Sequence, residues 1–292
     1  MEEFRVTNEE VEWAAAETFK RAITQVPPDV LRSLELAVAE ETEPIAKQCL
    51  QMMLRNAEEA QHNRVICQDT GIPVFIIEAG PGVTFDSGLR SAFERGVERV
   101  SREMDLRQMA VHPLTRKEYG YNIGRGVPII HFRMKEGFPL VRITAIPKGA
   151  GSGTWGRVAF LQPLEGIAGV KRFVLESVVT AGSNPCPPTI IGIGIGGDLE
   201  EVALMATLAS CRPIGSRHEE DDIAALEDEI LKLVNEVGIG PMGLGGKTTA
   251  LAVNIEYAFT HKPWLPVALN IQCWTGRRAT ALLFPGGRRE IV

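Results

Sequence analysis

Three cysteines occupy turn-rich or strand-end contexts, where a thiol can act chemically rather than fill a core. They are Cys67, Cys186 and Cys273, and long stretches of chain separate them, so no local hairpin joins them. Thiolates bind soft metals, and three protein ligands leave one coordination position open for a substrate. If the fold brings the three thiols together, the sequence predicts a metal site with an open position.

The other two cysteines follow a helical pattern. Cys49 lies at helical spacing from Ile45, and Cys211 lies at helical spacing from Leu208. A free cysteine behaves as a small buried hydrophobe, and such spacing usually indicates core packing. An odd total of five cysteines argues against a complete disulfide framework.

The composition is that of an ordinary globular protein, with 45% hydrophobic and 23% charged residues over 292 positions. A net charge of −6 gives no electrostatic reason to expect nucleic acid or an anionic membrane as a partner. We see no signal peptide pattern and no apolar run near the ~20 residues that a membrane span needs. We therefore expect a cytoplasmic protein, in which separated cysteines are more often metal-binding or catalytic than bridged.

The first hundred residues are predicted to be mainly helical. Thr7 and Glu10 form a capping-box pattern at the start of the first helix. A second helical region over 29–63 is divided at Pro44, because proline removes a helix hydrogen bond.

Strands and further helices are predicted in the rest of the chain. The strands predicted at 127–134 and 140–146 are separated by a short turn-like segment, which indicates a hairpin. An apolar strand over 265–272 delivers Cys273 at its end. The other expected elements are a strand at 73–78 and helices at 87–104, 166–181, 198–211 and 219–237. We expect one mixed α/β domain over residues 1–292, with a helical N-terminal layer packed on a mixed sheet.

Two of the cysteine motifs have informative neighbours. The segment 67–71 (Cys-Gln-Asp-Thr-Gly) places a thiol beside an amide, a carboxylate and a hydroxyl, and Gly71 permits a positive φ. Its alternative interpretation is an Asx-type turn with a buried thiol. The segment 184–188 (Asn-Pro-Cys-Pro-Pro) surrounds Cys186 with prolines that fix φ and remove amide donors. A rigid segment with few amide donors suits a metal ligand. The alternative interpretation is a plain structural turn.

Three glycine-rich segments imitate known motifs. The run Gly192-x-Gly194-x-x-Gly197 matches a dinucleotide fingerprint, but the strand before it is too short and no clean βαβ unit is expected. We interpret these glycines as allowing close backbone approach to a cluster, with the next helix N-terminus facing bound anions.

The other two segments fail at single positions. A phosphate-binding loop at 240–248 would need glycine where Pro241 stands, although the helix expected after Thr249 could bind an anion. A serine-nucleophile elbow at 148–154 would need glycine where Ala150 stands. That glycine-rich loop could instead hold a carboxylate through its amides and hydroxyls.

The histidines carry weaker signals. His62, His112 and His131 have no local partner that distinguishes them, and His218 is predicted to cap or terminate a helix. His261 precedes the strand that carries Cys273 and could reach the same pocket, although a structural role is the alternative. Arg107 also has two interpretations. It could make a surface ion pair, or its planar guanidinium could bind a substrate carboxylate.

Taken together, the motifs resemble the α subunit of the iron–sulfur hydro-lyases, the class I fumarases and L-tartrate dehydratases, or the N-terminal domain of their fused versions. The ordered set spans nearly the whole chain. The segments that carry the resemblance are 67–71, 106–107, 113–116, 148–152, 184–197, 212–218, 238–246, 272–274 and 277–278.

The resemblance implies that Cys67, Cys186 and Cys273 ligate a [4Fe–4S] cluster. Such clusters usually take four cysteine thiolates, so three leave the fourth iron open. In the family that iron acts as a Lewis acid on the substrate hydroxyl and makes water a better leaving group. The implied reaction is the reversible addition or removal of water on a C4 dicarboxylate, with fumarate and malate expected first.

The resemblance also implies which residues bind the substrate. They are Gln68, Asp69, Arg107, Ala150, Gly151, Ser152, Gly153, Thr154, Arg157 and His261. No catalytic residue is assigned, because the base of the family resembles part of a β portion that this chain lacks. We therefore expect a β-type hydro-lyase subunit as partner, in an α2β2 assembly.

Some segments depart from typical fumarases. Residues 118–122 are Glu-Tyr-Gly-Tyr-Asn where those enzymes carry Asn-Thr-Gly-Asp-Asn, and residues 153–157 replace a Glu-Asn continuation. Segments 124–128, 156–157 and 212–218 look closer to L-tartrate dehydratase, whereas 192–197 and 240–246 look like fumarase.

The alternatives are therefore an L-tartrate dehydratase α subunit and a non-catalytic iron–sulfur sensor or regulatory protein. A structural zinc protein is disfavoured, because no pair of cysteines has the close spacing of common zinc sites.

Overall fold

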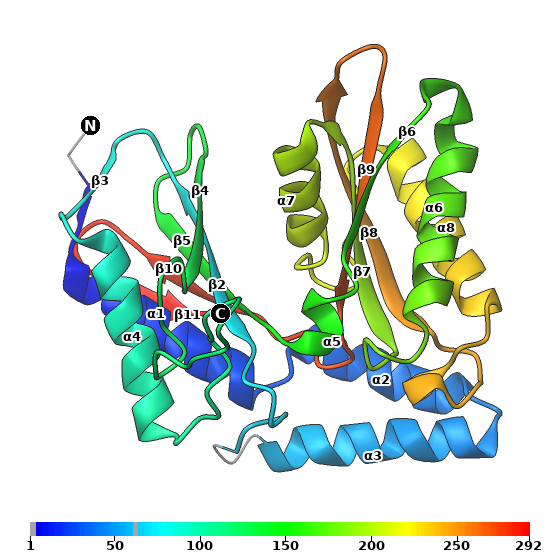
Figure 1. Ribbon diagram of the computed structural model, residues 1–292, viewed down its shortest axis with the longest axis horizontal. Helices are drawn as coiled ribbons and strands as arrows, with labels where there is room; N and C mark the ends of the chain where they lie inside the picture. The colour runs from blue at the N-terminus through cyan, green and yellow to red at the C-terminus, as the bar shows by residue number, and fades with distance from the viewer. Residues whose placement is uncertain (1–3, 61–63) are drawn as a thin grey trace. The chain divides into compact units, whose positions relative to one another are not determined.

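The computed structural model describes residues 4–60 and 64–292, and its contacts divide the chain into two compact units. Unit 1 comprises Met1–Gln25, Ala60–Gly149 and Arg277–Val292, and unit 2 comprises Val26–Glu59 and Ala150–Gly276. Each unit combines helices with a mixed sheet (Figure 1), so the predicted mixed α/β class is confirmed. One catalytic domain over residues 1–292 stays a prediction. Among the described helices, none has the length and apolar character to cross a membrane.

Unit 1 is built on a five-stranded sheet in the order β11-β10-β5-β2-β4. Its strands are β2 (Ile72–Ala79), β4 (Ile129–Met134), β5 (Val141–Lys148), β10 (Ala279–Leu283) and β11 (Arg289–Ile291). The β2–β4 pair is parallel, and the other neighbours are antiparallel. A separate parallel pair joins β1 (Phe4–Val6) to β3 (Val83–Phe85).

The predicted hairpin between the strands near 127–134 and 140–146 is wrong. Both strands exist, as β4 and β5, but β2 lies between them and pairs with each. The strand β2 is buried along most of its length. Its backbone polar groups therefore need partners on both edges, and a local β4–β5 pair would leave one edge unsatisfied.

Two helices pack in unit 1, α1 (Asn8–Thr24) and α4 (Leu89–Glu103). They contact each other, and α1 also packs on β5 and β10. The predicted capping box is confirmed: the Thr7 hydroxyl accepts the Glu10 amide at 3.2 Å, and the Glu10 carboxylate accepts the Thr7 amide at 2.8 Å. These bonds satisfy amide groups that a helix start otherwise leaves without partners.

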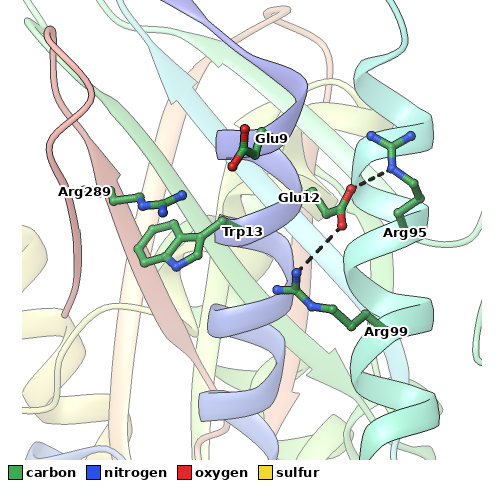
Figure 2. Close-up of a pocket in the computed structure, with 6 residues that line it drawn as sticks. All are labelled: Glu9, Glu12, Trp13, Arg95, Arg99 and Arg289. Carbon is green, nitrogen blue, oxygen red and sulfur yellow. Dashed lines mark hydrogen bonds and ion pairs between the residues drawn. The ribbon is translucent and has the colours of Figure 1, made fainter.

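A pocket of about 370 Å³ in unit 1 is lined by residues of α1, α4 and β11 (Figure 2). Arg95 and Arg99 both contact the Glu12 carboxylate, at 2.6 and 3.7 Å. The Arg289 guanidinium lies 4.6 Å from the centre of the Trp13 ring. These groups already pair with one another, so the pocket gives no reason to infer a ligand.

Unit 2 is built on a four-stranded sheet in the order β6-β9-β7-β8. Its strands are β6 (Arg157–Leu161), β7 (Thr189–Gly197), β8 (Ala250–Thr260) and β9 (Leu265–Gln272). Its helices are α2 (Pro28–Glu40), α3 (Pro44–Ala60), α5 (Ala150–Gly153), α6 (Gly166–Ala181), α7 (Leu199–Ala209) and α8 (Asp221–Glu236), with short 3-10 turns η1 (Pro163–Glu165) and η2 (Pro241–Gly243). The helix α7 covers one face of the sheet, and α6 and α8 cover the other (Figure 1).

The glycines of β7 have a packing role, which corrects the expectation that they approach a cluster. A Cβ at Gly192 would lie 2.1 Å from the Ala206 carbonyl oxygen, and one at Gly194 would lie 2.1 Å from that of Val202. Both contacts are with α7, so glycine lets this helix lie against the strand. The parallel strands β7 and β8 are joined through α7 and α8, a crossover unit that we did not expect.

The predicted anion site at the start of the next helix is not supported. Asp198 caps α7, and its carboxylate accepts the Glu201 amide at 2.9 Å. Glu200 and Glu201 add further negative charge to the first turn. The carboxylates of Asp198, Glu200 and Glu201 thus already compensate the positive end of the helix dipole.

The division of the second helical region at Pro44 is confirmed, because α2 ends at Glu40 and α3 begins at Pro44. The predicted end of that region, near residue 63, lies outside the described residues, as does His62. The helix expected after Thr249 is wrong, since residues 250–260 form β8. That segment is rich in β-branched and aromatic residues, which favour a strand.

Candidate functional site

The turn that carries Cys186 follows α6 directly and joins it to β7. The helix ends at Ala181, whose carbonyl accepts the backbone and side-chain amides of Asn184 at 3.2 and 2.9 Å. Cys186 has a φ of 56°, in the left-handed region that side chains other than glycine rarely occupy. Such a conformation costs about 1–2 kcal/mol and points to a functional constraint on the residue.

The turn that carries Cys273 adjoins the Cys186 turn. Cys273 follows the last residue of β9, as predicted, and the Trp274 amide donates to the Cys186 carbonyl at 3.1 Å. The Cys273 thiol lies 3.0 Å from the Thr275 hydroxyl. Both thiols are half-buried, whereas Trp274 and Thr275 are buried. Two of the three predicted cysteine motifs therefore meet in unit 2.

A glycine-rich loop packs on the same turn. The Met242 amide donates to the Pro187 carbonyl at 2.8 Å. A Cβ at Gly243 would lie 2.5 Å from the Cβ of Ser183, so only glycine allows this approach. The segment that imitated a phosphate-binding loop thus helps to shape the turn of Cys186.

The predicted carboxylate-binding loop is a single helical turn, α5. A Cβ at Gly151 would lie 3.0 Å from the Asn184 carbonyl oxygen, so this turn also lies against the Cys186 motif. Ser152 is buried, while Ala150, Gly153 and Thr154 are exposed. The Thr154 amide donates to the Ala150 carbonyl at 3.0 Å.

The other two predicted residues of unit 2 lie on β6 and in the connection between β8 and β9. Arg157 begins β6, and its guanidinium lies 6.0 Å from the ring of Phe173 in α6. His261 is exposed between β8 and β9, at the end of β9 opposite to Cys273. At ~3.3 Å per residue the length of this strand separates the two by roughly 25 Å. Unit 2 therefore does not bring His261 to its cysteine turns.

The Cys67 turn lies in unit 1, immediately before β2. The Asp69 carboxylate accepts the Gly71 amide at 3.0 Å, and Gly71 has a φ of 79°. The Asx-type turn and the positive φ are thus confirmed. The buried thiol of that alternative interpretation is wrong, because Cys67 is exposed.

The same turn contacts the segment of Arg107. The buried Thr70 hydroxyl donates to the Arg107 carbonyl at 2.9 Å. The side chains of Gln68 and Arg107 are exposed, and Asp69 is half-buried. Unit 1 therefore gathers Cys67, Gln68, Asp69 and Arg107 in one region.

Sequence reasoning gave no role to Arg277, which the structure ties to this region. Its guanidinium donates to the carbonyl of Asp69 at 2.7 Å and to that of Thr70 at 3.3 Å. Residues 277–278 contributed to the resemblance, but their sequence gives no signal for these contacts, because both partners of Arg277 are backbone groups.

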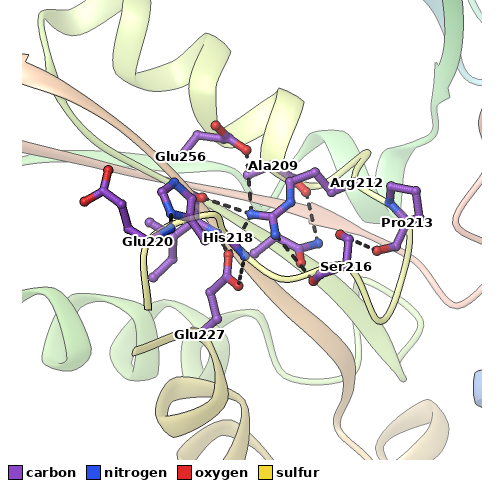
Figure 3. A network of polar contacts seen from close by, with 10 residues as sticks. Ala209, Arg212, Pro213, Ser216, His218, Glu220, Glu227 and Glu256 are labelled. Carbon is purple, nitrogen blue, oxygen red and sulfur yellow. Dashed lines mark hydrogen bonds and ion pairs between the residues drawn. The ribbon is translucent and has the colours of Figure 1, made fainter. Parts of the chain in front are cut away.

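A second polar network lies in unit 2, around an ion pair between the half-buried Arg212 and the buried Glu227 (Figure 3). The Arg212 guanidinium donates to the Glu227 carboxylate at 2.7 Å, and this carboxylate also accepts the Ile255 amide at 2.8 Å. His218 accepts the Glu220 amide at 3.1 Å just before α8, but Glu220 is the cap residue and no side chain caps this helix, so the predicted capping role is not confirmed. These contacts explain the 212–218 segment as a structural connection between α7 and α8.

The cysteines assigned to packing lie in or after helices. Burial raises the pKa of the Cys49 thiol in α3, which disfavours the thiolate that binds metals. Cys211 follows α7, and its sulfur lies 3.9 Å from the Gln272 amide nitrogen.

His131 is half-buried, and burial lowers its pKa. Of the other histidines, His112 has a local role that we did not predict, since it accepts the amides of Leu114 and Thr115, each at 3.2 Å.

Within residues 4–60 and 64–292, the structure contains no group of three or more His, Cys, Asp or Glu side chains arranged to hold a metal ion. The donor chemistry nevertheless fits a soft metal, because Cys67, Cys186 and Cys273 are not disulfide-bonded, and the first is exposed and the other two half-buried.

Comparisons with known proteins show the family of the chain. The family model described as Fumarate hydratase (Fumerase) matches residues 12–282. The chain is 41% identical over 267 residues to the "Putative L(+)-tartrate dehydratase subunit alpha" of Methanocaldococcus jannaschii, which covers 90% of this chain and 94% of that protein. It is 34% identical over 261 residues to the L(+)-tartrate dehydratase subunit alpha of Escherichia coli K12, which covers 89% of this chain and 86% of that protein.

These matches define the class of the protein as a hydro-lyase. More particularly, the chain belongs to the fumarate hydratase (Fumerase) family. The family implies an iron–sulfur cluster, in agreement with the predicted resemblance.

Proposed function

We propose that the chain is the α subunit of a [4Fe–4S]-dependent hydro-lyase that reversibly adds water to, or removes it from, a C4 dicarboxylate. Fumarate and malate form the first substrate pair to test. The match of the fumarate hydratase family model to residues 12–282 is the observation that carries this proposal. A cytoplasmic location remains a prediction.

Cys67, Cys186 and Cys273 would hold the cluster. The adjoining turns of Cys186 and Cys273 and the left-handed conformation of Cys186 support two of these ligands. The exposed thiol of Cys67 beside the Asx-type turn supports the third. When bound, a cluster with an open iron supplies a Lewis acid for the substrate hydroxyl.

The residues of this chain would bind and orient the dicarboxylate. The exposed guanidinium of Arg107 suits a bidentate contact with a carboxylate. Gln68 and Asp69 would contact the substrate from the same region of unit 1. In unit 2, the turn from Ala150 to Thr154 would contribute amide and hydroxyl donors.

Arg157 and His261 were also predicted to bind substrate. Arg157 pairs with Leu269, four residues before Cys273, so it stays a proposed contact, whereas His261 lies at the far end of β9. The position of His261 within unit 2 does not support contact with a substrate at the cysteine turns. His261 would belong to that pocket only if another chain contributed it.

A β-type subunit would complete the enzyme. The relatives are named as alpha subunits, which supports a beta partner for this chain. We expect the partner to supply the catalytic base, and an α2β2 assembly is the expected stoichiometry.

L(+)-tartrate is the second candidate substrate, because both relatives described above are named for its dehydration. Tartrate differs from malate by one additional hydroxyl group. Loss of water from malate gives fumarate, and loss of water from tartrate gives the enol of oxaloacetate. The same binding groups and the same bond cleavage therefore serve both substrates.

The proposal can be tested with anaerobically reconstituted protein. We expect brown protein with about four iron atoms per chain. Combined with its β-type partner, it should turn over malate, followed by NMR, or tartrate, followed by enzymatic reduction of oxaloacetate. Protein that rejects iron would overturn the proposal. A cluster-loaded complex that turns over no hydroxy-diacid would instead indicate the non-catalytic iron–sulfur sensor.

A further inference from the structure

A buried arginine holds the backbone of the candidate substrate-binding turn in unit 1. The guanidinium of Arg277 is only 4% exposed and donates to the carbonyl oxygens of Asp69 and Thr70, at 2.7 and 3.3 Å. Removing a guanidinium from water costs several kcal/mol unless hydrogen bonds replace the lost hydration. Two of those hydrogen bonds are made with the Asp69–Thr70 backbone, so the conformation of this segment depends on Arg277.

The Asp69 side chain is constrained at the same place. One carboxylate oxygen accepts the Gly71 amide at 3.0 Å. The other lies next to Gly149, where a Cβ would be 2.7 Å from this oxygen and 2.8 Å from a terminal nitrogen of Arg277. The carboxylate and the guanidinium are therefore neighbours over Gly149, and opposite charges at this separation attract each other.

The same contacts continue to Arg107. Its carbonyl oxygen accepts the Thr70 hydroxyl at 2.9 Å and the Asn122 side-chain amide at 3.2 Å. Thr70 is 4% exposed and Asn122 is fully buried. The Asn122 side chain also accepts the Met109 amide at 2.7 Å, so it binds the chain on both sides of Gln108. The backbone of Arg107 is thus fixed from two directions while its side chain remains exposed.

We propose that Arg277, together with Thr70 and Asn122, positions Asp69 and Arg107 for a dicarboxylate. This inference rests on the proposed function. The three residues touch no substrate themselves. They hold a carboxylate and a guanidinium at a fixed separation before the substrate arrives. Preorganisation of this kind matters, because a displacement of about 1 Å in a binding group can cost on the order of 100-fold in rate.

Two variants test the proposal, each in the full chain. Arg277→Lys retains the charge but loses the planar guanidinium, of which one nitrogen donates to both carbonyls and the other lies beside the Asp69 carboxylate. Thr70→Val retains the volume but removes the donor to Arg107. Arg288→Lys is the matched control, since Arg288 lies in the same unit with a largely exposed side chain.

The first measurement is amide hydrogen exchange in the cluster-free chain, which is independent of activity. We expect Arg277→Lys to accelerate exchange at the Gly71 amide at least tenfold, because the turn that protects it loses its support. The control should leave this exchange unchanged. Exchange at Gly71 that is equal in all variants would overturn the proposal.

The second measurement is steady-state kinetics of the cluster-loaded complex with its β-type partner. We expect kcat/KM to fall on the order of 100-fold for Arg277→Lys, with iron content unchanged. For Thr70→Val we expect KM to rise about tenfold with a smaller change in kcat, since Arg107 would bind a substrate carboxylate. The control should stay within twofold of the natural chain.

The outcomes separate this inference from the proposed function. If the natural complex turns over no hydroxy-diacid, the proposed function fails, and the exchange experiment still decides whether Arg277 holds the turn. If activity falls only in proportion to lost iron or lost folded protein in both variants, Arg277 and Thr70 have merely structural roles and the proposal is wrong.

Discussion

The turn at Cys67 and the turn at Cys186 present the same side chain, but different forces hold them. In unit 1, side chains hold the turn: the Asp69 carboxylate binds an amide, and the Arg277 guanidinium binds two carbonyls. In unit 2, the backbone holds the turn through prolines, a left-handed cysteine and hydrogen bonds from neighbouring amides.

This difference predicts how each turn responds to substitution. Side-chain contacts can be lost one at a time, and long side chains can move to relieve a clash. Backbone contacts through glycine offer no such relief, because a new Cβ meets atoms that cannot rotate away. Changes in unit 1 should therefore reduce activity more than stability, and changes in unit 2 should do the reverse.

The largest expected effect concerns the cysteines themselves. Cys186→Ser should remove most cluster binding, because a hydroxyl group is a poor ligand for iron in such clusters. Cys49→Ser should leave the iron content intact, since burial raises the pKa of that thiol and so disfavours the thiolate that binds metals. The measurement is the iron content per chain of each variant after anaerobic reconstitution. Equal loss in the two variants would contradict the division of the cysteines.

A glycine pair tests the rigidity of the Cys186 region. A Cβ at Gly240 would lie 1.7 Å from the Gly245 carbonyl oxygen, at a φ of 68°. Gly238 has a similar φ of 72° but no atom within 4 Å of its Cβ position. We expect Gly240→Ala to lower the free energy of unfolding by about 3 kcal/mol or more, and Gly238→Ala by only about 1 kcal/mol.

Denaturant unfolding of the two variants gives this difference. Gly240 has a ψ of 179°, in a region open almost only to glycine, so the difference measures this backbone strain together with the clash with Gly245. Similar losses for both variants would mean that the loop can shift, and the proposed rigidity of unit 2 would be wrong.

Gly149→Ala makes the corresponding test in unit 1. The new methyl group would press on the ends of two side chains, Asp69 and Arg277, rather than on the backbone. We expect a stability loss of about 1 kcal/mol but a fall in kcat/KM on the order of tenfold or more, since Asp69 is displaced. Gly82→Ala is the control, as nothing lies within 4 Å of its Cβ position. A variant that loses stability but keeps full activity would remove the contrast between the units.

The smallest effect is a dependence on pH in unit 2, where Glu41 binds the glycine-rich loop. Burial alone would raise the pKa of this carboxyl. Amide hydrogen bonds from Glu43, Lys247 and Thr42, with the charge of Lys247, outweigh burial and hold the pKa below 4.5. The unfolded chain then binds the proton more tightly than the folded chain. The stabilisation is therefore present above about pH 4.5 and is lost as pH falls through the folded pKa.

Thermal unfolding between about pH 3 and pH 6 measures this contribution. Glu41→Gln should flatten the dependence of stability on pH relative to the natural chain. Glu35→Gln in α2, at an exposed position, should leave that dependence unchanged. If the two variants behave alike, Glu41 does not contribute as its hydrogen bonds indicate.

Local patterns in the sequence predicted the elements well where the information was local. The helix at 166–181 and the strand at 265–272 match α6 and β9, because apolar periodicity and flanking turn residues determine both. The pairing of strands could not be predicted in the same way. The strand β2 takes β4 and β5 on its two edges, and that choice depends on burial of β2 rather than on the turn between its partners.

The site was only partly predictable for a similar reason. The cysteine motifs, Asp69 and Arg107 stand out by residue type. The roles of Gly192 and Arg277 depend on what lies opposite them, a helix backbone in one case and two carbonyls in the other. Such partners are backbone atoms distant in sequence, and they leave no pattern in the residues themselves.

The segmented composition of unit 1 has a consequence for how the protein is made. Its sheet takes β10 and β11 from residues 277–292, which the ribosome adds after every residue of unit 2. Until then β5 has an open edge, which is a template for unwanted pairing with other chains. A nascent chain would therefore complete unit 2 first and hold a half-built sheet, so chaperone demand should peak late in translation.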